Sequence, residues 1–169
     1  MSASASTNSH KPLLLVDIDG VISLFGGAQL ASKDGSFHSI DGMFHFLSST
    51  AAAHLLALEE QFELVWCSGW EEKANEHLPR LLGLPPALPY LRFERAVGRA
   101  NAHWKLAAID QFAGERALAW IDDALNEACH QWADARTAPT LLVATAPEHG
   151  LTDGEAELLM GWADDLSAG

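Results

Sequence analysis

Short runs of almost entirely apolar residues recur along the chain and predict buried β-strands. Four of them are residues 13–17 (LLLVD), 62–67 (FELVWC), 118–122 (LAWID) and 140–144 (TLLVA). Continuous apolar runs of this length are typical of parallel strands whose sheet is covered on both faces. Residues 90–94 (YLRFE) are a fifth candidate, although prolines crowd the approach to it. The pattern therefore predicts a mainly parallel five-stranded sheet.

The segments between these runs place apolar residues at helical spacing. The predicted helices are residues 51–62, 70–82, 102–113, 124–135 and 152–166. Gly83 and the prolines after it end the second helix, and Thr152 with Glu155 forms a capping box for the last. Strands that alternate with helices form βαβ units. We therefore predict an α/β fold, a doubly wound sheet in a three-layer arrangement with helices on both faces.

One segment, residues 21–47, interrupts this alternation. It contains the turn pairs Asp34-Gly35 and Asp41-Gly42. Such pairs are typical of tight turns between antiparallel strands, so we expect one or two β-hairpins that project as a flap from the end of the first strand. No large second domain fits between the other elements. The predicted organisation is a disordered tail over residues 1–10 and a single domain over residues 11–169.

Composition and charge narrow the possible partners. Hydrophobic residues make up 49% of the 169 residues, which suits a globular domain with a sizeable core. The formal net charge of -13 argues against stable nucleic-acid binding through basic patches. No apolar run approaches the roughly 20 residues that span a bilayer, and the polar start lacks the apolar centre of a secretory signal. Cys67 and Cys129 form no disulfide framework, so we expect a cytoplasmic location.

Polar residues follow several of the predicted strands at the point where each strand ends. These residues are Asp17 and Asp19, Ser68 and Gly69, and Asp122 and Asp123, with Lys105 on a helix ahead of the last pair. In an open α/β sheet, ligands bind at the carboxyl ends of the strands, so we expect these side chains to converge there.

This set of side chains has a chemical logic. Carboxylates gathered in one crevice repel one another and need a cation, and hard oxygen ligands suit Mg²⁺. One carboxylate can attack phosphorus to form an aspartyl-phosphate, and a second can protonate the leaving oxygen and then activate water. A hydroxyl and an ammonium can hold the remaining phosphoryl oxygens. The residues therefore predict a Mg²⁺-dependent phosphohydrolase that acts on phosphate monoesters.

The same residues resemble the four motifs of the haloacid dehalogenase (HAD) superfamily in order and in spacing. The motifs are DIDGV (17–21), Ser68, Lys105 and IDD (121–123), and the resemblance covers residues 13–166. WCSGWEEKAN (66–75) and LAWIDD further resemble a bacterial subgroup that includes HAD-type domains of multidomain RNA repair proteins.

The resemblance implies a role for each carboxylate. Asp17 would be the nucleophile and a metal ligand, and Asp19 would be the general acid and base with its backbone carbonyl on the metal. Asp122 would bind Mg²⁺ directly, and Asp123 would bind it directly or through water. The implied fold is a HAD-like Rossmannoid sheet without a cap domain, so the site would be open to bulky substrates, including a nucleic-acid end.

The remaining motif residues would bind the phosphorylated substrate. Ser68 would hydrogen-bond the phosphoryl group, and Lys105 would neutralise the charge of the nucleophile and phosphate. Gly69 and Trp70 are predicted to form part of the wall of the substrate site. Residues 21–47 would correspond to the flap beside the active site, where His38 and His45 are either substrate contacts or ordinary filling residues.

Purely structural roles remain open for several of these residues. Ser68 and Glu71 have the spacing of a capping box for the helix that follows. Asp122 and Asp123 could be helix N-caps before Ala124. Trp70 could simply be a core residue of that helix.

Three other functions fit parts of the pattern. A receiver-type signalling module also gathers acids, a hydroxyl and a lysine around Mg²⁺, but its lysine comes last, whereas Lys105 precedes Asp122 here. A haloacid dehalogenase does not need a second acid at the position of Asp19, because a halide leaves without a proton. A catalytically weak phosphate-binding or repair accessory protein remains possible on the same fold.

Overall fold

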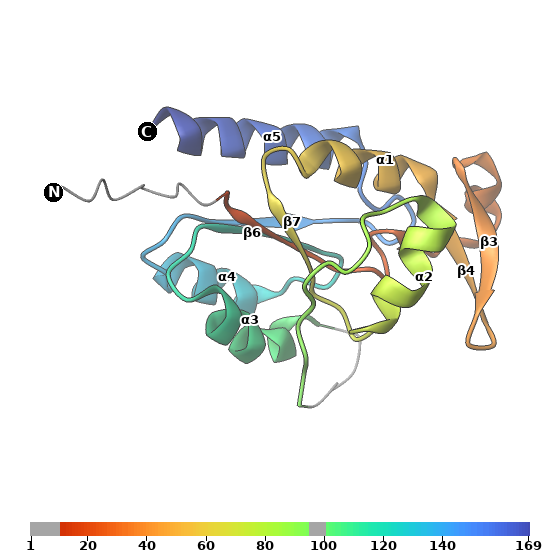
Figure 1. Cartoon of the computed structure of the whole chain (residues 1–169), viewed down its shortest axis with the longest axis horizontal. Helices are drawn as coiled ribbons and strands as arrows, with labels where there is room; N and C mark the ends of the chain where they lie inside the picture. Colours follow the sequence, from red (N-terminus) through yellow and green to blue (C-terminus); the bar gives the residue numbers. More distant parts are fainter. Residues whose placement is uncertain (1–10, 95–100) are drawn as a thin grey trace, which may run out of the picture.

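The computed structural model describes residues 11–94 and 101–169 (Figure 1). Its centre is a four-stranded parallel sheet with the strand order β5-β1-β6-β7. These strands are β5 (Glu63–Trp66), β1 (Leu13–Val16), β6 (Leu118–Asp122) and β7 (Thr140–Ala144). All four coincide with the strongest apolar runs, which confirms the α/β fold class. The predicted tail over residues 1–10 lies outside the described residues.

Helices cover both faces of this sheet. In Figure 1, α1 and α5 lie above it and α3 and α4 lie below it. The upper layer and its flank contain α1 (Ser49–Leu58), α2 (Lys73–Leu82) and α5 (Asp153–Ala168), and the lower layer contains the 3₁₀ turn η2 (His103–Lys105), α3 (Leu106–Ala113) and α4 (Glu127–Ala135). The predicted three-layer, doubly wound arrangement is therefore confirmed.

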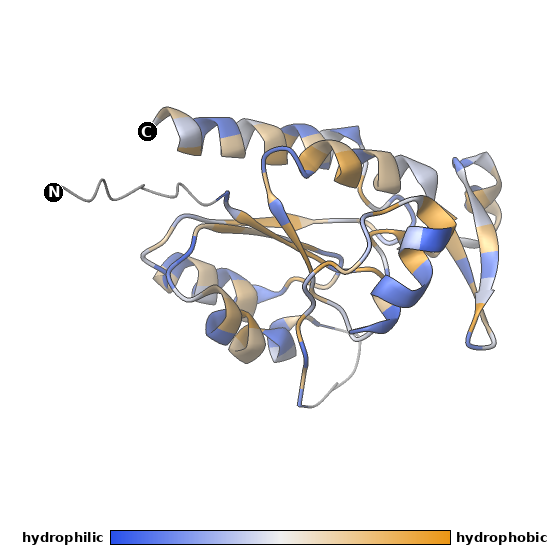
Figure 2. Cartoon of the chain, viewed as in Figure 1, coloured by the Kyte–Doolittle hydropathy of each residue, from blue (hydrophilic) through white to orange (hydrophobic). Residues whose placement is uncertain are grey.

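Successive residues of β1 pack into two different cores. Leu14 and Val16 belong to the core shared with α1 and α5, whereas Leu13 and Leu15 belong to the core shared with α3 and α4. All four side chains are at most 1% exposed. A strand that is buried on both faces cannot alternate apolar and polar residues, which explains the continuous apolar runs that Figure 2 shows along the sheet.

The predicted fifth strand is reduced to one bridge. Tyr90 pairs with Trp66 in parallel, on the free edge of β5, but residues 91–94 continue without a ladder. The reason is that the backbone N–H of Phe93 donates to the Glu71 carboxylate (3.0 Å), so it does not face a strand. The sheet therefore has one strand fewer than the sequence predicted, although the segment lies where that strand was expected.

The flap forms a second, three-stranded antiparallel sheet with the order β2-β4-β3. It contains β2 (Ser23–Leu24), the 3₁₀ segment η1 (Gly27–Ser32), β3 (Gly35–Ile40) and β4 (Met43–Ser48). Asp41 and Gly42 turn the hairpin with φ angles of 50° and 80°, which is the left-handed backbone that this turn pair accommodates. Asp34-Gly35 leads into β3 instead of turning a hairpin. One hairpin therefore projects at the edge of the molecule (Figure 1).

Helix ends agree with the sequence pattern in part. Gly83 ends α2 in the left-handed conformation (φ 69°), and Thr152 with Glu155 forms the predicted capping box of α5. In contrast, α2 begins only at Lys73, and α4 begins after an Asn126 cap instead of at residue 124. Among the helices of the described residues, none has the length and apolarity needed to cross a membrane.

Candidate active site

The strand order determines where a ligand can bind. From β1 the chain proceeds outward to β5 on one side, while β6 and β7 lie on the other, so the order reverses between β1 and β6. A crevice opens at the carboxyl ends of strands at such a reversal. A cavity of about 410 Å³ lies there. Its walls include all the residues predicted for the site, namely Asp17, Asp19, Ser68, Gly69, Trp70, Lys105, Asp122 and Asp123.

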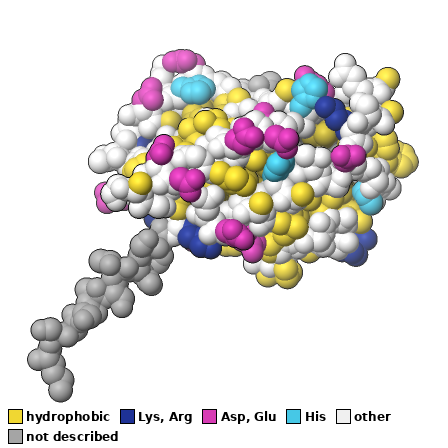
Figure 3. Space-filling model, turned by 90° about the horizontal axis from the view of Figure 1, so that it is seen from above, with side chains coloured by type: hydrophobic (Ala, Val, Ile, Leu, Met, Phe, Trp, Pro, Cys, Tyr) yellow, Lys and Arg dark blue, Asp and Glu magenta, His cyan; other side chains and the backbone are white. Residues whose placement is uncertain are grey.

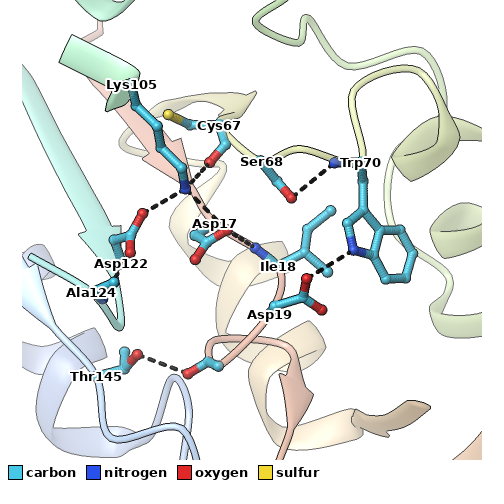
Figure 4. A network of polar contacts seen from close by, with 11 residues as sticks. Asp17, Ile18, Asp19, Cys67, Ser68, Trp70, Lys105, Asp122, Ala124 and Thr145 are labelled. Carbon is cyan, nitrogen blue, oxygen red and sulfur yellow. Dashed lines mark hydrogen bonds and ion pairs between the residues drawn. The ribbon is translucent and has the colours of Figure 1, made fainter. Parts of the chain in front are cut away.

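Lys105 joins the ends of three strands (Figure 4). Its ammonium donates to the Asp122 carboxylate (2.7 Å) and to the Cys67 carbonyl (2.9 Å), and its Nζ lies 3.2 Å from Asp17 Oδ1. Asp17, Lys105 and Asp122 are all at most 7% exposed. An ammonium at this depth requires such partners, because a buried unpaired charge is costly. The structure thus brings the predicted lysine and two predicted carboxylates into direct contact.

Among the residues that the structure describes, the site carries more negative than positive charge. Carboxylate oxygens of Asp17, Asp122 and Asp123 lie within 4.8 Å of one another, and Lys105 is the cation of residues 11–94 and 101–169 that contacts this group. Burial raises the pKa of Asp17 well above its ordinary value, and burial together with the charge of Asp122 raises the pKa of Asp123. Burial lowers the pKa of Lys105, but its neighbouring negative charges outweigh this effect and the pKa lies above its usual value. An all-oxygen donor set with excess negative charge fits a hard divalent cation.

Gly20 accounts for how closely two of these strand ends approach. It has a φ of 82°, and a Cβ atom at this position would lie 2.2 Å from Asp123 Oδ2. Its carbonyl accepts a hydrogen bond from the Thr145 hydroxyl (2.8 Å) at the end of β7. Steric crowding therefore explains why the DIDGV motif has a glycine at this position: any side chain would displace Asp123 from the cluster.

Ser68 lies in a turn and not in a helix cap. Its hydroxyl accepts the backbone N–H of Trp70 (3.2 Å) and lies in the cavity wall beside Gly69. The Glu71 carboxylate binds Phe93 instead of returning to Ser68. The capping box that the spacing suggested is therefore absent, and the buried Ser68 hydroxyl borders the space next to Asp17.

The acidic pair at the end of β6 is not a helix cap either. Asp122 Oδ1 accepts the backbone N–H of Ala124 (2.9 Å), which is a local turn. The cap of α4 is Asn126, whose side chain accepts from the Cys129 N–H (3.3 Å). The second oxygen of Asp122 remains available to Lys105, so the turn and the ion pair use different atoms.

Asp19 lies on the opposite side of the cavity, against Trp70 (Figure 4). The Trp70 indole N–H donates to Asp19 Oδ2 (3.3 Å), and His45 of the flap packs edge-on against the indole ring. Trp70 precedes α2 and lines the cavity, so it is a wall residue outside that helix, although its partly buried side chain also packs against the core. His38 bonds to Ser36 (2.8 Å) and is not among the residues lining this cavity.

Five lining residues were not anticipated from the sequence. Phe25 comes from the flap, Ala124 follows the acidic pair, and the other three, Asn101, Ala102 and Trp104, come from the turn ahead of α3. The position of Trp104 directly before Lys105 was the one available signal, because a neighbour of a buried site lysine lies near the same cavity. Nothing in the sequence pattern distinguished Phe25 or Asn101 from other loop residues.

Comparisons with known proteins identify a family for this chain. Residues 13–156 match the family described as "HAD domain in Swiss Army Knife RNA repair proteins". No curated protein matches the chain. A crystal structure resembles it with a TM-score of 0.42 and 17% sequence identity, over 92% of this chain and 82% of that chain. That structural likeness is too low to carry an argument, whereas the family match spans every motif discussed above. The chain therefore belongs to the family of HAD domains found in Swiss Army Knife RNA repair proteins.

Proposed function

We propose that this protein is a Mg²⁺-dependent phosphomonoesterase that acts through an aspartyl-phosphate on Asp17. The observation that carries the proposal is the contact of Lys105 with both Asp17 and Asp122 in the cavity that Ser68 also lines. A carboxylate, a cation and a hydroxyl around one space large enough for a phosphoryl group support this reaction, in which the carboxylate would be the nucleophile.

Each residue has a defined part in the proposed reaction. Asp17 attacks phosphorus and the bond from phosphorus to the leaving oxygen breaks, while Asp19 gives its proton to that oxygen. Asp19 then takes a proton from water, which attacks the aspartyl-phosphate, frees Asp17 and releases phosphate. Lys105 and Ser68 hold phosphoryl oxygens throughout.

The donor set implies which residues would hold the metal. The Asp17, Asp122 and Asp123 side chains, with the Asp19 backbone carbonyl, would bind Mg²⁺. When bound, the ion supplies positive charge that offsets the carboxylates and the phosphoryl oxygens.

Added Mg²⁺ is expected to stabilise the fold through these carboxylates. At a Mg²⁺ concentration of about 100 times Kd the gain is about 2.7 kcal/mol, which corresponds to roughly 5–10 °C in Tm. Because burial raises the pKa of Asp17 and Asp123, protons compete with the ion, and the gain should shrink as the pH falls below neutral. Thermal unfolding with MgCl₂ or chelator at two pH values measures both effects.

Asp123→Asn and Asp110→Asn are the matched variants for this measurement. Asp123 belongs to the carboxylate cluster, whereas Asp110 lies on α3 outside the cluster and accepts a hydrogen bond from Trp132 of α4. Asp123→Asn should lose most of the Mg²⁺ shift, and Asp110→Asn should keep it. Equal shifts in the two variants would contradict the proposed ion site.

The proposed substrate is a phosphorylated nucleotide or nucleic-acid end. The family description and the aromatic walls formed by Phe25, Trp70 and Trp104 support a planar, nucleobase-like group. The net charge of -13, visible as scattered acidic side chains in Figure 3, supports brief contact with a chain end and not stable nucleic-acid binding. A small phosphorylated molecule is the alternative substrate.

The cytoplasmic location remains a prediction. Its basis in the sequence was the small number of cysteines, and these two residues, Cys67 and Cys129, are free thiols in the structure.

Phosphate release from a panel of monoesters tests the proposed function. The panel contains an aryl phosphate, nucleoside 5′- and 3′-monophosphates and oligonucleotides phosphorylated at either end, each with Mg²⁺ and with chelator. Metal-dependent release that ranks the nucleotide substrates above the aryl phosphate supports the proposal. The absence of release from any substrate by folded protein would replace it with a phosphate-binding or accessory role.

A further inference from the structure

We infer that Trp70 is a positioning residue for Asp19: its indole N–H holds the acid/base carboxyl in the orientation needed to protonate the leaving group. The inference rests on the proposed phosphomonoesterase function and assigns Trp70 a role beyond lining the substrate site. It concerns the orientation of a proton donor.

The contact is specific to one atom of each residue. Trp70 Nε1 donates to Asp19 Oδ2 over 3.3 Å, and the pair is partly buried. Asp19 Oδ1 is buried and has no hydrogen-bond partner within the described part of the chain. The indole is therefore the hydrogen-bond donor to this carboxyl among the described residues, while His45 Nδ1 lies farther away, 4.0 Å from Asp19 Oδ1. Asp19 has two rotatable side-chain bonds, so a lost restraint would let the carboxyl turn away from the leaving oxygen.

The indole ring itself is held from two sides. The backbone N–H of Trp70 donates to the Ser68 hydroxyl (3.2 Å), which ties the residue to the phosphate side of the cavity. On the other side His45 packs edge-on, with ring centroids 5.0 Å apart at 68°. His45 in turn hydrogen-bonds the Ser23 hydroxyl (2.9 Å) in the flap sheet. A ring fixed in this way can restrain Asp19, as a freely rotating side chain could not.

Trp70→Phe separates the hydrogen bond from the ring. Phenylalanine keeps an aromatic wall and the contact with His45, but it has no N–H to donate. The measurement is kcat/KM for a series of phenyl phosphates whose ring substituents vary the basicity of the leaving oxygen. Every member has one aromatic ring as its leaving group, so the loss of a wall contact should not follow the basicity of the leaving oxygen, whereas a misplaced acid affects the basic leaving groups most.

The expected result for Trp70→Phe is that kcat/KM falls more steeply as the leaving oxygen becomes more basic. For unsubstituted phenyl phosphate we expect a loss of roughly 10–100-fold, which is typical of a misplaced catalytic group. For a dinitrophenyl phosphate, which leaves without protonation, we expect little change. Asp19→Asn should show the same steepening in stronger form. A uniform loss across the series, or no loss at all, would overturn the positioning role of Trp70.

Trp132→Phe is the matched control. Trp132 also donates its indole N–H to an aspartate, Asp110 (2.8 Å), but this pair lies outside the cavity. In Trp132→Phe, kcat/KM should depend on leaving-group basicity as it does in the unaltered protein. An independent readout is the NMR signal of the Trp70 indole N–H, which Asp19→Asn should shift and Asp110→Asn should not. An unmoved signal would also overturn the inference. If the unaltered protein hydrolyses neither this series nor any substrate of the panel above, the proposed function fails, and the positioning role fails with it.

Discussion

Asp17→Asn is expected to reduce phosphate release by at least about a thousandfold, equivalent to roughly 4 kcal/mol of activation free energy. Asp17 would form the bond to phosphorus, and an amide at the same position is a far weaker nucleophile. Asparagine has nearly the same shape, so the packing at the end of β1 should be unchanged. The measurement is kcat/KM for the best substrate of the panel, with Mg²⁺ present.

The same variant should not be less stable when metal is removed. Burial raises the pKa of Asp17 in the folded protein, so its ionised form destabilises the fold above that pKa. Replacing it with a neutral amide removes this cost, and we expect the metal-free variant to match the unaltered protein or to exceed it by about 0.5–2 kcal/mol. Retention of more than about a tenth of the activity would contradict the nucleophile assignment, because covalent catalysis contributes several kcal/mol.

Lys105→Met is expected to destabilise the metal-free fold by about 3–5 kcal/mol and to abolish activity. The substitution leaves Asp17 and Asp122 buried without the ammonium that contacts both of them. Methionine fills much of the space of the lysine stem, so the loss reports mainly on charge. Urea unfolding in chelator at neutral pH measures it.

The pH dependence of this loss has a defined sign. Burial already raises the pKa of Asp17 in the folded protein, and without the charge of Lys105 it rises further above its unfolded value. Stability that is lost at neutral pH should therefore return as the pH falls and Asp17 becomes protonated.

Lys73→Met is the control for the lysine substitution. Lys73 also forms a 2.7 Å ion pair with an aspartate, Asp41, but both side chains are 55% exposed. An exposed pair is screened by water, so its removal should change stability little. If Lys105→Met costs no more than Lys73→Met, then Lys105 does not hold the buried carboxylates as the structure indicates.

Much of the fold was predictable from the sequence because β1 and β6 are buried along their whole length and β5 is buried from Leu64 to Trp66, whereas the edge strand β7 is mostly half-buried. Continuous burial produces apolar runs that no other pattern in this chain imitates. The weaker apolar run at residues 90–94 wrongly predicted a full strand. Strand formation there depends on whether the backbone N–H and C=O groups pair with β5 or with other groups. The Glu71 side chain takes the N–H of Phe93, a competition that is invisible in a local pattern.

The candidate site was likewise predictable from the sequence only in part. Asp17, Asp122 and Lys105 could be named in advance, because strand ends of a parallel sheet meet at one edge and carboxylates there need a cation. The spacing of Ser68 and Glu71 equally suggested a capping box, and the sequence could not choose between a cap and a turn in the cavity wall. Contacts between distant segments made that choice.

The sequence by itself therefore determined the strands, the layers and the kinds of side chain at the strand ends, because these follow from local burial and chain direction. Only the tertiary structure decided which atoms touch. Lys105 between Asp17 and Asp122, Gly20 against Asp123, and the indole of Trp70 on Asp19 are contacts between separate strand ends and loops. Their geometry depends on how tightly the loops pack over the sheet, and no spacing along the chain encodes that distance.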